Sequence, residues 1–196
     1  SYENSLDEIK VSGWCEDLIY HNGEVFVCNI EKDLIYVIDV SNNTITDSIL
    51  LSKSPKVIQQ DNLNRFWVLS GGNQQENILP VISIIEENTH NIIKTINLID
   101  NQSSPISLRV NNSTNEVFFI NKHVYKLSSI ESEVPEIIWE NTGENFYNLE
   151  IDPYSNDLYL TDAKDYVQRG SLIILDNNGN FKTEVSTGII PKSIVF

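Results

Sequence analysis

The chain has 196 residues, of which 40% are hydrophobic, and this is enough to build a buried core. Its formal net charge is −15, and its few basic residues form no local patch, which argues against a nucleic-acid partner. No run approaches 18 uncharged apolar residues, which argues against a membrane-spanning segment.

The chain begins with a short strand-like run at residues 6–11, and a repeated unit follows it. In the first copy, residues 16–20, 25–29, 34–40 and 44–51 are rich in Val, Ile, Leu and Tyr, as strands are. The turns between these runs are short, and short turns join antiparallel neighbours. The first copy is therefore predicted to be a four-stranded antiparallel meander.

Three more copies follow, and each begins with an anchor of the Pro-x-x-Ile type. The anchors lie 40 to 50 residues apart, a spacing typical of propeller blades. They begin at Cys15, Pro55, Pro105, Phe146 and, after the last copy, Pro191. Each ends three positions later on an aliphatic residue, namely Leu18, Ile58, Leu108, Leu149 and Ile194.

Two further columns support the repeat. Residues that tolerate a positive φ stand ahead of the second strands, at Gly23, Asn64, Asn115 and Asn156. Small polar residues close the same strands, at Asn29, Ser70, Asn121 and Asp162. We therefore expect one turn geometry in all four copies. Pro80 lies inside the third strand predicted at 79–85, where we expect a bulge or an irregular edge.

These patterns predict an all-β protein, a β-propeller with blades over residues 12–51, 52–98, 99–140 and 141–187. A twisted sheet with two apolar faces must bury both, and blades stacked around an axis do so. The flanking strands predicted at 6–11 and 189–196 lack the partners of a further blade. We therefore expect a single propeller domain that is part of a larger ring of about seven blades, with a closed four-bladed ring as the alternative.

The two cysteines lie in the first hairpin, whose register is set by the turn at 22–23. In that register Cys28 faces Asp17, and Cys15 lies diagonal to Cys28. Diagonal positions are about 7–8 Å apart, which is long for a disulfide. We expect two buried free thiols, with a bridge as the alternative.

The anchors, second strands such as VFVCN and LYLTD, and third strands such as LIYVID resemble YncE-like or YVTN-repeat propellers. This group includes surface-layer-type lipoproteins of gut bacteria that carry the domain of unknown function DUF5074. The resemblance covers nearly the whole chain, although Cys15 and Phe146 depart from the anchor proline. It implies an exported binding protein at the cell surface or in the periplasm, and one branch of the group captures vitamin B12. Residues 1–10 do not resemble a signal peptide, so any signal or lipoprotein leader would already have been removed, and a lipid anchor would be attached to a missing N-terminus.

In a propeller, the connections between second and third strands and those between blades lie on one side, where ligands usually bind. The long connections at 71–78 and 163–170 contrast with the third copy, where the connection shrinks to Lys122. Aromatic, amide and charged groups there could hold a large polar ligand. The candidate residues are Trp14, Gln74, Gln75, Asn77, Phe146, Tyr147, Lys164, Tyr166, Gln168 and Arg169. Alternatively, Trp14 and Phe146 pack between blades and both long loops are merely solvated.

No catalytic motif or metal motif stands out. Residues 152–157 (DPYSND) lack the spacing of a calcium loop and are predicted to form a turn. His21, His90 and His123 occupy different places in their copies, which argues against a three-histidine metal site. We expect no cofactor and a non-enzymatic protein that binds a small molecule, such as a corrinoid or glycan, or another surface protein. A lyase or hydrolase acting at the channel mouth and a structural surface-layer component are the alternatives.

Overall fold

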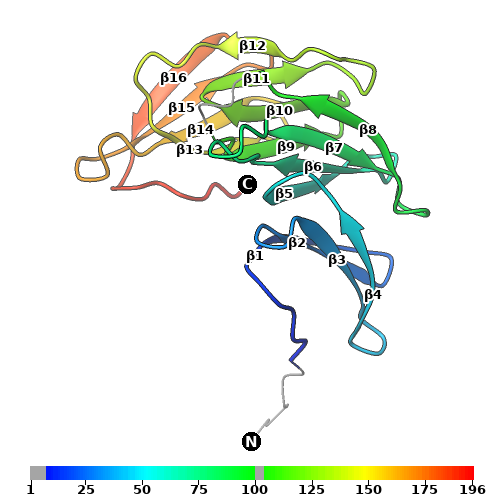
Figure 1. Ribbon diagram of the computed structural model, residues 1–196. Helices are drawn as coiled ribbons and strands as arrows, with labels where there is room; N and C mark the ends of the chain where they lie inside the picture. Colours follow the sequence, from blue (N-terminus) through cyan, green and yellow to red (C-terminus); the bar gives the residue numbers. More distant parts are fainter. Residues whose placement is uncertain (1–7, 100–103) are drawn as a thin grey trace, which may run out of the picture.

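The computed structural model describes residues 8–99 and 104–196, which form four sheets of four antiparallel strands (Figure 1). Blade 1 contains β1 (Cys15–His21), β2 (Glu24–Asn29), β3 (Leu34–Asp39) and β4 (Thr44–Leu50), and blade 2 contains β5 (Pro55–Gln60), β6 (Phe66–Ser70), β7 (Val81–Ile85) and β8 (Ile92–Asn97). Blade 3 contains β9 (Ser107–Asn111), β10 (Glu116–Asn121), β11 (His123–Leu127) and β12 (Glu136–Trp139), and blade 4 contains β13 (Phe146–Ile151), β14 (Leu158–Asp162), β15 (Ser171–Leu175) and β16 (Phe181–Ser186). The predicted all-β fold with four-stranded blades is confirmed.

The four blades follow one another as an open arc. The first strands β1, β5, β9 and β13 lie side by side in that order, so each blade packs on the next one in the chain. Among the described residues there is no comparable packing of β13 against β1. Figure 1 shows blade 1 at one end of the arc and blade 4 near the other. The alternative of a closed four-bladed ring is therefore wrong. The described residues contain no helix that is long and apolar enough to cross a membrane.

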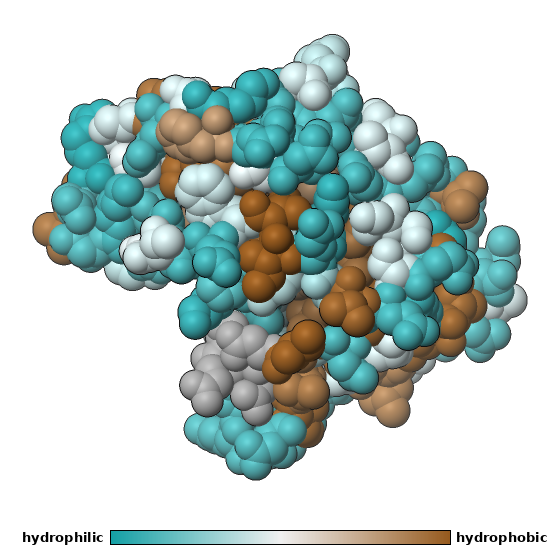
Figure 2. All heavy atoms as spheres, turned by 90° about the horizontal axis from the view of Figure 1, so that it is seen from above, coloured by the Kyte–Doolittle hydropathy of each residue, from teal (hydrophilic) through white to brown (hydrophobic). Residues whose placement is uncertain are grey.

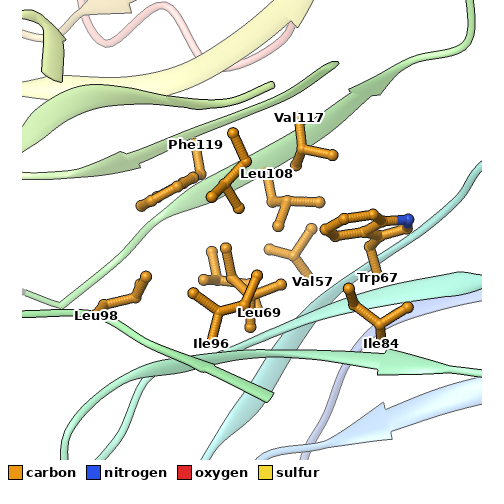
Figure 3. Packing of buried hydrophobic residues seen from close by; sticks show 11 residues of the cluster. Val57, Trp67, Leu69, Ile84, Ile96, Leu98, Leu108, Val117 and Phe119 are labelled. Carbon is orange, nitrogen blue, oxygen red and sulfur yellow. The ribbon is translucent and has the colours of Figure 1, made fainter. Parts of the chain in front are cut away.

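Hydrophobic clusters between the blades form the core. Successive residues of a strand point to opposite faces of the sheet, so one strand can contribute to two clusters. In β6, Phe66 and Val68 pack toward blade 1, whereas Trp67 and Leu69 pack toward blade 3. Figure 3 shows Trp67 and Leu69 below Val117 and Phe119 of blade 3. This double burial explains why the second strands are apolar without interruption.

One residue just before the second strand has a positive φ in every blade, although the turns differ in length and Asn22 of blade 1 also has a positive φ, of 49°. The φ angle of this residue is 88° at Gly23, 63° at Asn64, 61° at Asn115 and 61° at Asn156. These values lie in the left-handed region, which glycine and asparagine enter at lower cost than other residues. The predicted left-handed backbone at these four positions is confirmed, whereas the rest of the turn differs between blades.

Two of the predicted strands are wrong. The described residues 8–11 of the run predicted at 6–11 are not in a strand, and residues 6 and 7 lie outside the described part. Residues 189–196 also form no strand. A strand requires a neighbour with which its backbone groups can form hydrogen bonds. Among the described residues no sheet beyond the four blades provides one, so an apolar, strand-like sequence is not enough at these positions.

The irregularity expected at Pro80 is also wrong. Pro80 lies just before β7, where its missing N–H interrupts no strand pairing. Its carbonyl accepts a hydrogen bond of 2.9 Å from the backbone N–H of Leu98. The shift in register between β7 and β8 occurs instead at the other end of β7, between Ile84 and Ile85.

The register of the first hairpin is as predicted, because Asp17 pairs with Cys28. Both cysteines are free, which confirms that part of the prediction, and Cys28 is buried. Cys15 is exposed, so the expectation that both thiols are buried is wrong. A bulge between Cys15 and Asp17 places Cys15 opposite Asn29, at the rim of the sheet. Burial raises the pKa of the Cys28 thiol far above its ordinary value.

Replacing Phe119 tests the packing between blades 2 and 3. Phe119 is buried, and its ring stacks on Tyr125 with the centroids 5.1 Å apart. Phe119→Ala leaves a cavity and should lower the free energy of unfolding by about 3–5 kcal/mol in urea denaturation. Leu63→Ala, at an exposed turn position, is the control and should change it by less than about 0.5 kcal/mol. Equal effects of the two variants would contradict the assignment of the core.

Replacing Asn64 tests the turn geometry. Because its φ is positive, Asn64→Ala should destabilise the protein by about 1 kcal/mol, whereas Asn64→Gly should cost less. The difference between the two midpoints of thermal unfolding measures the cost of the β-carbon. If alanine were tolerated as well as glycine, the turn would have a different conformation in solution.

Candidate ligand-binding face

A cavity of about 410 Å³ lies where the first strands of the four blades converge. Polar and charged groups line it, among them Asp17, Ser107, Arg109 and Asn148. Every blade contributes to its wall, and so does the segment at Lys192 and Ser193. The cavity therefore depends on the arrangement of all four blades rather than on one loop.

One position of the repeat supplies a large part of this wall. The second residue of all five anchors lines the cavity, namely Glu16, Lys56, Ile106, Tyr147 and Lys192. The fourth residue of the anchor packs between blades in the last three blades, as Ile58 does. The repeat thus keeps its aliphatic fourth residue for the core and varies its second residue at the cavity.

The cavity lies on the side where the blade connections emerge, because Glu16, Lys56 and Tyr147 are near the beginnings of their strands. Backbone hydrogen bonds join the two kinds of connection on this side. The N–H of Gly71 donates to the carbonyl of Ser54 at 2.8 Å, and that of Ala163 donates to Asn145 at 2.9 Å. We call this side the connection face. In the view of Figure 2, hydrophilic residues cover much of the visible surface, and hydrophobic residues form separate patches between them.

A second hollow of about 220 Å³ lies between blades 3 and 4 and shares Ile106 with the first. Its wall includes Lys122, Asn141, Glu144 and Asn145. In blade 3 the connection after β10 consists of Lys122 alone, so no longer loop fills this space. The short connection is thus as important for the shape of the face as the long ones.

The charges inside the cavity are partly removed from water. Burial raises the pKa of Asp17, although the backbone N–H of Ile58 donates to its carboxylate at 3.0 Å and acts in the opposite direction. Burial lowers the pKa of Lys56, whose ammonium donates to the hydroxyl of Ser104 at 2.8 Å. Arg109 is held by Glu150, with Nε and Oε2 2.8 Å apart. The cavity wall therefore contains carboxylates, cations and hydroxyls, which suits a ligand with both donors and acceptors.

Three of the residues predicted from the sequence lie on the connection face of blade 4, namely Tyr147, Lys164 and Tyr166. The rings of Tyr147 and Tyr166 are 6.3 Å apart, edge to face. The Tyr166 hydroxyl lies 3.4 Å from Oδ1 of Asn145, which belongs to the second hollow. The ammonium of Lys164 pairs with the buried Asp162 at 2.7 Å, so this lysine also stabilises the loop.

Other predicted residues have structural contacts. Phe146 is buried in the cluster between blades 3 and 4, and it also borders the second hollow. Trp14 is exposed at the edge of blade 1, and its indole N–H donates to Glu16 at 2.8 Å. The backbone N–H of Gln168 donates to Asp165 at 2.8 Å, and Nε of Arg169 donates to Ser186 at 3.1 Å.

The remaining three predicted residues, Gln74, Gln75 and Asn77, lie in the connection between β6 and β7. A bridge between Asn73 and Ile78 closes this connection into a tight turn. Five charged residues of the cavity wall were not predicted from the sequence, namely Glu16, Asp17, Lys56, Arg109 and Lys192. The column of second anchor residues could have revealed three of them, because it changes chemistry from blade to blade.

The histidines occupy separate places. The His21 ring contacts Glu87, and that of His90 lies 2.9 Å from Asp47, so both link blades 1 and 2. His123 Nδ1 accepts a hydrogen bond of 3.0 Å from the backbone N–H of Asn141. In the described part of the chain, no group of three or more His, Cys, Asp or Glu side chains is placed to hold a metal ion.

The segment 152–157 is the turn that was predicted. Its backbone closes on itself, because the N–H of Asp152 donates to the carbonyl of Asp157 at 2.9 Å. The carboxylate of Asp152 accepts a hydrogen bond of 2.8 Å from the N–H of Tyr154. This bond lowers the pKa of Asp152. The alternating carboxylates and amides therefore serve the turn itself.

No family model matches the chain, and no curated protein is similar to it. Solved structures with a similar fold include hydrazine synthase of Kuenenia stuttgartiensis, with a TM-score of 0.63, 13% identity and coverage of 85% of this chain and 51% of that one. Raptor of Chaetomium thermophilum has a TM-score of 0.67 and 14% identity, with 90% and 16% covered. Dihydro-heme d1 dehydrogenase NirN, solved in complex with DHE, has a TM-score of 0.68 and 12% identity, with 92% and 39% covered.

These similarities concern the fold alone, because the identities are low. The chain spans about half, or less, of the length of these three proteins. It is an all-β protein built of propeller blades in an open arc.

The pH dependence of stability tests the pair of Asp162 and Lys164. Burial alone would raise the pKa of Asp162, but hydrogen bonds from Lys164 and from the N–H of Asn145 outweigh it and lower the pKa. A lowered pKa stabilises the fold above the ordinary pKa of the carboxyl, and this contribution is lost as the pH falls through the folded-state pKa. Asp162→Asn should therefore cost about 1–3 kcal/mol at pH 7, and the difference from the unchanged protein should shrink below about pH 4.

Urea denaturation at a series of pH values measures this difference. Asp165→Asn in the same loop is the matched control. Backbone hydrogen bonds from Gln168 and Val167 also lower the pKa of Asp165, but its carboxylate is exposed, so its effect on stability should vary less with pH than that of Asp162. A gap between unchanged protein and Asp162→Asn that does not vary with pH would show that the ion pair contributes nothing.

Proposed function

We propose that this chain is an exported, non-enzymatic binding protein that holds a small polar molecule on its connection face. The observation that carries the proposal is the cavity of about 410 Å³ to which all four blades contribute polar side chains. Its volume lies within the usual range of small-molecule sites, about 300–1,000 Å³. The likeness of its anchors to YncE-like surface proteins supports export and placement at the cell surface or in the periplasm.

The lining favours a glycan over a corrinoid as the ligand. Asp17, Lys56 and Asn148 offer acceptors and donors from the first strands of three blades, as a sugar with several hydroxyls requires. Tyr147 adds a partly exposed aromatic ring, on whose face a sugar ring can pack. A corrinoid is much larger than this cavity and would also have to occupy the second hollow beyond Ile106.

Binding measurements with defined probes test the proposal. We would titrate the protein with soluble mono- and disaccharides and, separately, with hydroxocobalamin, and follow heat release and, for the corrinoid, its visible spectrum. At least one probe should bind, and Tyr147→Ala should weaken it by about tenfold because one aromatic contact is lost. Tyr154→Ala is the matched control, since Tyr154 is an exposed residue of the turn at 152–157.

Two results would contradict the proposal. One is the absence of binding by every probe at millimolar concentration. The other is an equal effect of Tyr147→Ala and Tyr154→Ala, which would place the ligand outside the connection face.

A further inference from the structure

The outermost face of blade 1 is apolar, and no other blade covers it among the described residues. Val27 and Ile38 on this face are buried, and the hydroxyl of Tyr36 lies 3.2 Å from that of Ser12, but two large side chains stay exposed. We call the face of a blade that packs on the preceding blade its back face, and the face that packs on the next blade its front face. The strand register places Leu18 beside Val27 and Tyr20 beside Val25, and all four side chains lie on the back face of blade 1. The side chains of Leu18 and Tyr20 are 61% and 62% exposed.

The repeat shows what this face is built to contact. Leu18 is the fourth anchor residue of its blade, and its equivalents Ile58, Leu108 and Leu149 are at most 1% exposed. Each of the three is buried against the front face of the preceding blade, as Ile58 is against Phe26. The same position is therefore covered wherever a blade precedes it and exposed only in blade 1.

Blade 4 has the complementary surface. Its front face is defined by the register that pairs Tyr159 with Ile174 and Leu172 with Val185. On the second strand of blade 2 the equivalents of Tyr159 and Thr161 are Trp67 and Leu69, which blade 3 covers. Val185 is 50% exposed, and Tyr159, Leu172 and Ile174 are partly exposed. These apolar side chains share the face with Thr161 and Thr183, and exposed apolar groups gathered on one face are typical of a contact site.

We propose that the back face of blade 1 docks onto the front face of blade 4 in a second copy of this chain. The contact would repeat the packing already present between successive blades, front face on back face. It is head to tail, so two copies would form a ring of eight blades if the rotation closes, and a longer assembly if it does not. Eight blades lie within the range of known propellers.

The end of the segment after β16, beyond Lys192 and Ser193 of the cavity wall, would have to move to allow this contact. It now lies beside blade 4, where Phe196 touches Tyr159 with ring centroids 5.0 Å apart. Phe196 is itself 52% exposed, so little buried surface is lost when it leaves. In exchange, β1 of the second copy brings the exposed Leu18 and Tyr20 onto an apolar sheet.

Light scattering after gel filtration tests the contact on the full 196-residue chain. The molar mass should exceed the 22.3 kDa of one chain and rise with protein concentration. Leu18→Glu on the back face and Val185→Glu on the front face should each weaken association by more than about tenfold, because each places a charge in the contact. Leu63→Glu, an equally exposed position in a turn of blade 2, is the control and should leave association unchanged.

Mixing the two variants makes the test specific for a head-to-tail contact. Leu18→Glu keeps the front face of blade 4, and Val185→Glu keeps the back face of blade 1, so an equimolar mixture should regain a mass of two chains. Circular dichroism should show that all variants keep the β-sheet fold. A single-chain mass at all concentrations, equal behaviour of Leu18→Glu and Leu63→Glu, or no recovery on mixing would each overturn the proposal.

Discussion

Packing of one blade face on the next is the constraint on which the rest of this structure depends. Each blade is a sheet with two apolar faces, and water is excluded from both only when a neighbour lies on either side. In blade 2 this requirement is met, since Phe66 and Trp67 are both fully buried although they point in opposite directions. The same requirement is unmet at the back of blade 1, where Leu18 remains exposed although its equivalents in the other blades are buried.

Buried polar side chains then position the connection face on this apolar stack. Asn29 and Asp162 end the second strands of blades 1 and 4, and both are completely buried. Asn29 donates to the carbonyl of Ser12 at 2.7 Å, and Asp162 accepts from the N–H of Asn145 at 2.9 Å. Each of these bonds holds the segment that precedes the first strand of the same blade. A buried polar group must find such a partner, so these positions fix the rim of the cavity.

Core and cavity use different positions of the same anchor, and this separation bears on function. The fourth anchor residue is aliphatic in every copy because it must pack, whereas the second can be Glu16, Lys56, Ile106 or Tyr147. Changes at the second position alter the chemistry of the cavity and leave the packing between blades intact. A binding site of this kind can therefore take on new ligands while the fold remains the same, which agrees with the proposed function of the chain.

The sequence by itself determined the blades, because their causes are local. Burial on both faces of a blade requires apolar strands, and a positive φ at the turns favours Gly23 and Asn64. Both patterns recur every 40 to 50 residues, so the sequence shows where each blade lies. Tertiary structure decided the rest. Residues 189–196 have the composition of a strand but form none, since among the described residues no neighbouring strand pairs with them. The cavity likewise unites side chains as far apart as Glu16 and Lys192, and only the packing of four blades brings such distant residues together.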